Sequence, residues 1–316
     1  MEDLDLFGQK VVSTKPLRVN VYADEIQACV NQITNESWMY IGTTFEIIES
    51  SILLELLNQR YLKHLKGWEM YREKNDHVIH WAEISSAEQK NICERWLKYT
   101  YKNSQFYFSI FGVNLTNLNT SEFGDKDNFN VIYNRFFRTN LSFSLKKFFG
   151  QGVIVENIYH EQGQQKDSGY FDWHTIFKLD QDENLNFKCE RITFLPKSHE
   201  DNERSNVIQL TDVYLGIFKD LHLGLSNDSA KGRNFLTYKK PLLEIIEPLF
   251  RRVVEAPNNV NSSYNYVKRI NISLFPKSSS NKGDIRRVLN NFYEPRQIVL
   301  SYHEQNNPQA SLFKEI

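Results

Sequence analysis

The stretch RVNVYADEIQACVNQITNESWMYIGTTFEI, residues 18–47, contains two β-prone runs joined by a polar connection. The first run, 18–25, ends on Asp24 and Glu25, and the second, 38–47, is rich in aromatic and β-branched residues. The connection carries the Asn, Ser and Thr residues that are typical of a loop. The stretch therefore predicts two neighbouring antiparallel strands.

Further along the chain, helix-like and strand-like segments alternate. Residues 105–115 form the most continuous apolar run and predict a central strand that is covered on both faces. Ser85 or Ser86 is expected to cap a helix that runs to about Tyr101, with Glu88 as a capping-box partner. Further helices are expected over 46–65, 131–149, 207–221, 240–255 and 284–293, and further strands over 77–84, 153–158 and 187–196. This order predicts an α/β fold with a mixed sheet, antiparallel at one edge, parallel beyond it and flanked by helices.

The composition of the 316-residue chain is that of a globular protein, with 41% hydrophobic, 24% charged and 14% aromatic residues. No stretch approaches the roughly 20 apolar residues of a membrane-spanning helix. The acidic start, MEDLDLFGQK, lacks the features of a signal peptide. Three scattered cysteines indicate neither a disulfide framework nor a zinc site. We therefore expect a cytoplasmic protein that does not bind membranes.

Basic residues concentrate in the C-terminal third of the chain. Residues 229–300 contain thirteen Lys or Arg against five Asp or Glu, an excess of eight in a chain whose net charge is −1. A phosphate-binding region beside a metal-binding region would have this asymmetry, and so would two solvated faces of opposite charge. We place a soft boundary near Asp228, with a main domain over 1–228 and a basic, mostly helical extension over 229–316.

Asp24 and Glu25 end the first predicted strand and point to opposite faces of it. An acidic residue at the carboxyl end of a strand can hold a hard divalent cation such as Mg²⁺ through its carboxylate oxygens. Polar residues also end strands simply because the chain meets solvent there. This pair alone therefore does not define a site.

Asp212 lies in the interior of an otherwise apolar predicted helix, where Gln209, Asp212 and Gly216 form a stripe beside the core-facing one. Burial of an unpaired carboxylate is costly, so a cation, an arginine or a hydrogen bond should compensate it. The alternative is that Asp212 lies at the water boundary of the helix. Gly216 would let this helix approach a sheet closely.

Glu83 and Glu156 are further candidates because each interrupts a strand-like run, HVIHWAEI and VIVENI respectively. A charge inside a buried strand marks the carboxyl end of the strand or a satisfied site. The histidines lack metal-ligand spacing, and only His160, followed by Glu161, is retained as a proton-transfer or leaving-group contact. The chain has no Gly-rich dinucleotide motif, phosphate-binding loop or nucleophile elbow.

Three segments together resemble the domain of unknown function 3800 family: VYADE ending at residue 25, ITF at 192–194 and SNVIQLTD at 205–212. The similarity covers about residues 17–225. It implies a ribonuclease-H-like fold, and members of the family often occur near mobile elements and phage-defence or toxin systems. It also implies acidic residues, with Asp24 and Asp212 at matching positions, that hold two divalent cations for phosphodiester hydrolysis.

The resemblance leads to two hypotheses. In the first, the chain is a nuclease that hydrolyses RNA or DNA with Mg²⁺ or Mn²⁺, assisted by Glu25 or Glu161. The candidate catalytic and metal-binding residues of this nuclease are Asp24, Glu83, Glu156 and Asp212. In the second, the chain is catalytically degenerate and binds nucleic acid or a partner protein, since Asn114 ends the central strand where such a site often has Asp. Convergence of at least three carboxylates on one point would favour the first hypothesis.

Overall fold

The structure is a computed structural model of the chain. It describes residues 16–31, 34–61, 78–119, 123, 129–150, 152–197, 203–223, 232–255 and 268–276.

A mixed sheet of seven strands forms the centre of the described part of the chain. The strands are β1 (Arg18–Val30), β2 (Ser37–Ile47), β3 (Phe106–Asn114), β4 (Ile154–Glu161), β5 (Asn186–Phe187), β6 (Thr193–Leu195) and β7 (Ile270–Phe275). They lie in the order β5-β4-β1-β2-β3-β7. The strand β6 pairs with the last residues of β4, whereas β5 pairs with its first residues. The pairs β1–β2 and β2–β3 are antiparallel, whereas the pairs β1–β4, β4–β5, β4–β6 and β3–β7 are parallel. The predicted mixed α/β sheet and its antiparallel first pair are therefore confirmed. The expectation that the antiparallel part forms one edge is wrong, because parallel pairs lie on both sides of it.

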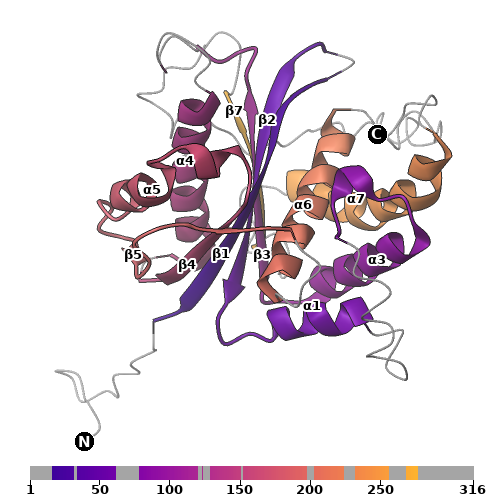
Figure 1. Cartoon of the computed structure of the whole chain (residues 1–316), viewed down its shortest axis with the longest axis horizontal. Helices are drawn as coiled ribbons and strands as arrows, with labels where there is room; N and C mark the ends of the chain where they lie inside the picture. Colours follow the sequence, from indigo (N-terminus) through magenta and orange to yellow (C-terminus); the bar gives the residue numbers. More distant parts are fainter. Residues whose placement is uncertain are drawn as a thin grey trace, which may run out of the picture.

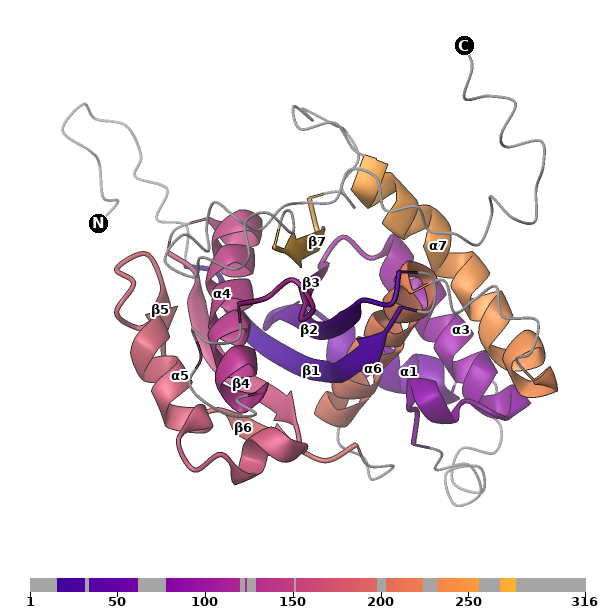
Figure 2. The same ribbon diagram turned by 90° about the horizontal axis from the view of Figure 1, so that it is seen from above.

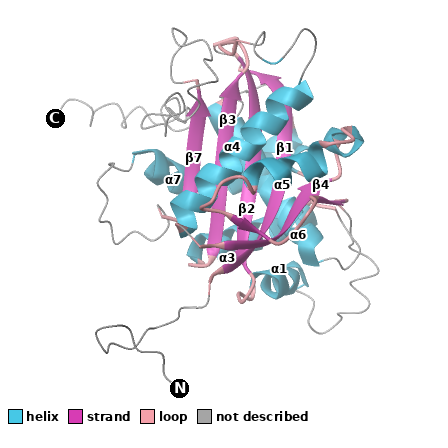
Figure 3. Ribbon diagram, turned by 90° about the vertical axis from the view of Figure 1, so that its left-hand side faces the viewer, coloured by secondary structure: helices cyan, strands magenta, loops and turns pink. Residues whose placement is uncertain are grey.

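Helices cover both faces of the sheet and make three layers (Figure 1). One face packs against α1 (Ile52–Tyr61), α3 (Ala87–Lys102), α6 (Glu203–His222) and α7 (Lys240–Glu255), and the other against α4 (Phe129–Phe149) and α5 (Phe171–Leu179). Figure 2 shows the same two groups from above, and Figure 3 shows α4 lying across the sheet. The described residues also form two short 3-10 helices, η2 (Trp81–Glu83) and η4 (Gln164–Asp167), and one π-helix, η6 (Phe235–Lys239).

The first strand is longer than its sequence pattern predicts. Residues 26–30, expected in a polar loop, continue β1 alongside β2, with a register shift between Ile26 and Cys29. The pairing of β1 with β4 ends earlier, at Ala23 and His160. Beyond this point β1 and β4 no longer pair, so the two strands part at Asp24.

The cap of α3 follows the predicted chemistry with a different partner. The Ser86 hydroxyl accepts a hydrogen bond from the Gln89 amide, and the Gln89 side chain accepts one from the Ser85 amide. Because Ser86 is the cap, the residue three positions later is Gln89 and not Glu88.

The prediction of a strand over 77–84 is wrong for its described part, residues 78–84. This segment contains only the turn η2 and lies across α6. Its backbone amides at Ile79 and Trp81 donate to the side chains of Gln209 and Asp212. The helix therefore satisfies backbone groups that a neighbouring strand would otherwise satisfy.

The C-terminal region joins the same sheet. The predicted helix over 240–255 is confirmed as α7, while the expected boundary at Asp228 and the expected helix over 284–293 lie outside the described residues. The strand β7 was not expected, and it pairs with β3 at one edge of the sheet. Its polar residues Asn271 and Ser273 are buried, and Asn271 donates to the Ser109 hydroxyl. Within the described residues, no helix combines the length and the apolar character needed to cross a membrane.

Candidate metal centre

The candidate site lies where β1 and β4 separate. Asp24 follows the last β1 residue that pairs with β4, and Glu161 is the last residue of β4. Side chains alternate along a strand, so Asp24 shares the face of Tyr22, which is the face that α6 covers. The strand β6 pairs with β4 up to Leu195, which brings Lys197, two residues later, to the same edge.

Three carboxylates converge on the Lys197 ammonium. Its nitrogen lies 2.9 Å from Oδ2 of Asp24, 3.1 Å from Oε1 of Glu161 and 3.2 Å from Oδ1 of Asp212. The Asp24 side chain is 1% exposed and that of Lys197 is 9% exposed. We call Asp24, Glu161 and Asp212 the carboxylate cluster. It combines residues of β1, β4 and α6, and a loop residue supplies its cation.

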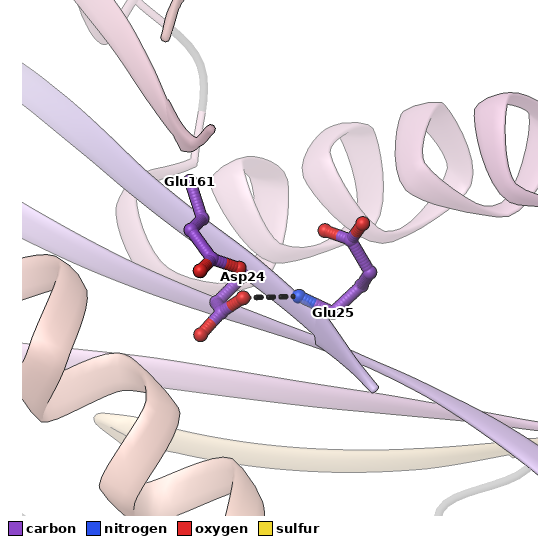
Figure 4. A group of neighbouring side chains, drawn as sticks. All are labelled: Asp24, Glu25 and Glu161. Carbon is purple, nitrogen blue, oxygen red and sulfur yellow. Dashed lines mark hydrogen bonds between the residues drawn. The ribbon is translucent and has the colours of Figure 1, made fainter. Parts of the chain in front are cut away.

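The two oxygens of Asp24 have different partners. The backbone amide of Glu25 donates to Oδ1 over 2.8 Å (Figure 4), which fixes the orientation of the carboxylate. Oδ2 is buried, and the Lys197 ammonium lies 2.9 Å from it. An oxygen of this kind is suited to a cation.

Asp24, Glu25 and Glu161 form a group that could hold a metal ion. Each offers one carboxylate oxygen, and the three oxygens lie within 4.8 Å of one another (Figure 4). Hard divalent cations such as Mg²⁺ prefer such oxygen ligands. This buried acidic group could therefore hold a metal ion, with its buried, incompletely paired oxygens as ligands.

Burial and mutual repulsion set the protonation of the cluster. Burial raises the pKa of Asp24 well above its ordinary value, and the charges of Asp212 and Glu161 add to the increase, although Lys197 opposes it. The pKa of Glu161 is lowered: burial acts to raise it, but a hydrogen bond from Asp24 and the Lys197 charge outweigh burial. Burial thus favours the protonated form of Asp24, and the neighbouring groups favour the ionised form of Glu161.

Asp212 is held as an anion. Burial acts to raise its pKa, but Lys197 and the hydrogen bonds from His80 and the Trp81 amide lower that pKa to about 2. Nδ1 of His80 lies 2.9 Å from Oδ2, the oxygen that also accepts from the Trp81 amide. The other oxygen, Oδ1, faces Lys197. The predicted need for compensation of this carboxylate is thus met by a cation and by hydrogen bonds.

A second polar group lies behind the cluster, on the face covered by α4 and α5. Nε2 of His160 lies 3.4 Å from Oε2 of Glu25 and accepts a hydrogen bond from the Tyr133 hydroxyl, because Nδ1 donates to the Glu161 carbonyl. Burial lowers the pKa of His160 to about 4. Burial, followed by the charge of Glu161, raises the pKa of Glu25 to about 8.

His160 does not have the exposure that its predicted role requires. Its side chain is fully buried among Tyr133, Phe137 and Phe171. It cannot reach a leaving group from this position. Its Nε2 lies beside Glu25 without a hydrogen bond to it.

Two of the four predicted ligands do not join the cluster. Glu156 lies five residues before Glu161, which is about 16 Å along the strand, and its Oε1 accepts from the Arg18 guanidinium over 2.7 Å. Glu83 is exposed at the end of η2. The carboxyl end of β4 is at residue 161, so Glu161, expected only to assist, takes the position that was predicted for Glu156.

Asn114 is not part of the site. It pairs with Trp38, whereas Asp24 pairs with Gly42, four residues further along β2 and about 13 Å away. Its side chain accepts a hydrogen bond from the Asn117 amide and stabilises the turn after β3. Asn114 therefore gives no reason to regard the acidic site as degenerate.

Lys197 was missed by sequence reasoning. It is one lysine in the polar segment PKSHEDNERS, which has no motif spacing. Its position could have indicated a role, because Lys197 directly follows a predicted strand and the carboxyl ends of parallel strands meet at one edge of the sheet.

The sequence matches no known protein-family model and no curated protein.

Proposed function

We propose that this chain is a divalent-metal-dependent nuclease that hydrolyses phosphodiester bonds of RNA or DNA. The observation that carries the proposal is the convergence of Asp24, Glu161 and Asp212, from β1, β4 and α6, on one cation. The proposed metal is Mg²⁺ or Mn²⁺, and the carboxylates that would hold it are Asp24, Glu25 and Glu161.

The fold and the resemblance both support the proposal. The sheet is antiparallel across β1, β2 and β3 and parallel from β1 to β4, as expected of the ribonuclease-H-like fold that the resemblance to the domain of unknown function 3800 family implies. Both family positions, Asp24 and Asp212, lie in the carboxylate cluster. The cytoplasm remains the proposed location, and a role in phage defence or in a toxin system follows from the resemblance alone.

The residues of the site divide the chemistry among them. A bound divalent ion would activate water and stabilise the charge that develops on the leaving oxygen. The amide of Glu25 and the contacts of Asp212 with His80 and Trp81 keep the carboxylates oriented without rearrangement. Burial excludes competing water from Asp24 and strengthens its attraction for a cation.

The basic C-terminal region reaches the edge of the site. The Lys239 ammonium lies 5.5 Å from the Trp81 ring centroid and donates to the Ala82 carbonyl, next to the segment that holds Asp212. We propose that this region contacts the phosphate backbone. Arg269 is an exception, because it is buried and donates to the carbonyls of Asn103 and Phe106.

Cleavage of labelled RNA and DNA in Mn²⁺ or Mg²⁺ tests the proposal. We expect the wild type to cleave one of them, and the Asp24→Asn and Asp212→Asn variants to lose at least about 100-fold in rate. Glu83→Gln is the control, because Glu83 is exposed and outside the cluster, and it should cleave like the wild type. Cleavage that survives both aspartate substitutions would contradict the metal-dependent mechanism.

A second function is favoured by one contact. The Lys197 ammonium already neutralises part of the charge of the cluster, as it would in a degenerate protein that binds nucleic acid or a partner without cleaving it. Binding of RNA or DNA without cleavage under any metal condition would support this alternative.

A further inference from the structure

The acidic site contains two places for a cation, and they share ligands. The first is the position of the Lys197 nitrogen, between Oδ2 of Asp24, Oε1 of Glu161 and Oδ1 of Asp212. The second is bounded by oxygens of Asp24, Glu25 and Glu161, which lie within 4.8 Å of one another (Figure 4). Only the first place includes Asp212, and only the second includes Glu25.

The first place cannot hold a metal ion while Lys197 is there. Mg²⁺ binds oxygen ligands at about 2.0–2.1 Å. An ion at that distance from the same three oxygens would overlap the ammonium, whose nitrogen is 2.9–3.2 Å from each of them. Departure of the lysine would leave the buried carboxylates of Asp24 and Asp212 and the partly exposed one of Glu161 without their cation, because its nitrogen makes all three contacts.

The second place has a ligand that lacks a partner. Oε2 of Glu25 is buried without a hydrogen bond, and the Glu25 side chain is 4% exposed. The imidazole of His160 lies 3.4 Å from this oxygen and is itself held by the Tyr133 hydroxyl and the Glu161 carbonyl. Because Tyr133 already occupies the acceptor nitrogen of His160, the imidazole gives this oxygen no hydrogen bond, and Oε2 of Glu25 remains without a partner.

We propose that Lys197 supplies one of the two positive charges of the site, so that the chain binds one divalent ion through Asp24, Glu25 and Glu161. This inference rests on the proposed function and specifies its metal content. Lys197 then acts as a positioning residue, because it holds the shared ligands Asp24 and Glu161 and neutralises Asp212.

The number of bound ions tests the proposal without nucleic acid. Mn²⁺ titration of the purified full chain, followed by electron paramagnetic resonance, counts the ions and gives their affinity. We expect one Mn²⁺ per chain for the wild type and for Lys197→Arg, and two for Lys197→Met, in which the first place is free. Two ions in the wild type, or no additional ion in folded Lys197→Met, would overturn the proposal.

A second pair of variants keeps the test decisive if Lys197→Met does not fold. Glu25→Gln removes a ligand of the second place and should weaken Mn²⁺ binding about tenfold or more. Glu156→Gln is the matched control on the same sheet and should bind like the wild type. Equal affinities of the two variants would overturn the assignment of the ion to Glu25.

Failure of the nuclease proposal gives a different pattern. One bound Mn²⁺ without cleavage of RNA or DNA would refute the activity and leave the metal count intact. Cleavage with two bound ions would support the activity and refute the role of Lys197. Absence of Mn²⁺ binding by every variant would refute both.

Discussion

The two carboxylate oxygens of Asp212 have different partners: one accepts hydrogen bonds, and the other forms an ion pair. Oδ2 accepts from the Trp81 amide and from His80, while Oδ1 faces Lys197. Each oxygen therefore has a partner from a different segment, which explains why an acidic residue is stable inside a buried helix. The position of this residue could be predicted from the sequence, because an aspartate in an apolar helix requires such partners.

Glu25 predicts a pH dependence of stability. Its pKa in the folded protein is raised to about 8 from an ordinary value of 4.5, first by burial and then by Glu161. Between these values the folded state holds a proton that the unfolded state has released, so the free energy of unfolding falls as the pH rises. The Glu25→Gln variant lacks this effect. Its stability relative to the wild type should therefore increase with pH, by at most about 1.4 kcal/mol per pH unit.

Urea unfolding at pH 6.5, 7.25 and 8.0 in the presence of a chelator would measure this difference. His160, whose pKa in the folded protein is about 4, is present in both proteins, so its contribution cancels in the difference. A difference in stability that does not change with pH would show that Glu25 is ionised in the folded protein.

Glu161 and Lys197 show where residue-level prediction ends. The apolar pattern predicted a strand over 153–158, but β4 continues to Glu161, so the carboxylate at its end could not be chosen from the pattern. Lys197 reaches the cluster through a long side chain from a loop. Side chains of loops have no periodicity, and only the pairing of β6 with β4 places this one.

At the scale of elements, α6 organises the site through a stripe of side chains. Gln209 and Asp212 accept the amides of Ile79 and Trp81, and Asp220 accepts the Trp81 indole N–H over 2.9 Å. Gly216 lies between the two aspartates along the stripe. A Cβ there would lie 2.2 Å from the Trp81 ring. The close approach predicted for Gly216 is thus made to Trp81 and not to the sheet.

The Gly216→Ala substitution should therefore destabilise the protein. The added methyl group must displace Trp81, and overpacking of this kind costs about 1–3 kcal/mol, partly offset by the better helix propensity of alanine. Urea unfolding of Gly216→Ala, Trp81→Ala and the double variant would separate these effects. We expect the substitution at position 216 to be much less destabilising when Trp81 is absent. An equal cost in both backgrounds would show that the two residues do not compete for space.

Several elements were predictable because their patterns are local. The two first strands, α7 and the cap at Ser86 depend on alternation, helical spacing and capping chemistry within short windows. The 78–84 segment and β7 depend on distant partners. The first has a strand-like composition but packs on α6. The second has alternating polar residues, of which Asn271 bonds Ser109 and Ser273 bonds Asn271.

At the scale of the whole molecule, the site joins segments from most of the described chain. Its charged groups come from β1, β4, α6 and the loop after β6. Lys239, which directly precedes α7, lies at the edge of the site. A metal ion bound only by the folded state should therefore stabilise the entire molecule. At a free Mn²⁺ concentration 100 times the dissociation constant, the expected gain is about 2.7 kcal/mol.

Thermal unfolding with Mn²⁺ and with a chelator would measure this gain. We expect a higher midpoint in Mn²⁺ for the wild type and no change for Asp24→Asn, because Asp24 belongs to both cation places. An equal increase in the wild type and in the variant would place the ion elsewhere.

The central claim is that the carboxylate cluster with Glu25, and not the other acidic candidates Glu83 and Glu156, performs phosphodiester hydrolysis. The most direct test compares Glu161→Gln with Glu156→Gln, two identical substitutions in the same strand, in cleavage of RNA and DNA with Mn²⁺. Glu156→Gln should cleave like the wild type, and Glu161→Gln should be at least about 100-fold slower. Wild-type cleavage by Glu161→Gln, or an equal loss in both variants, would contradict the claim.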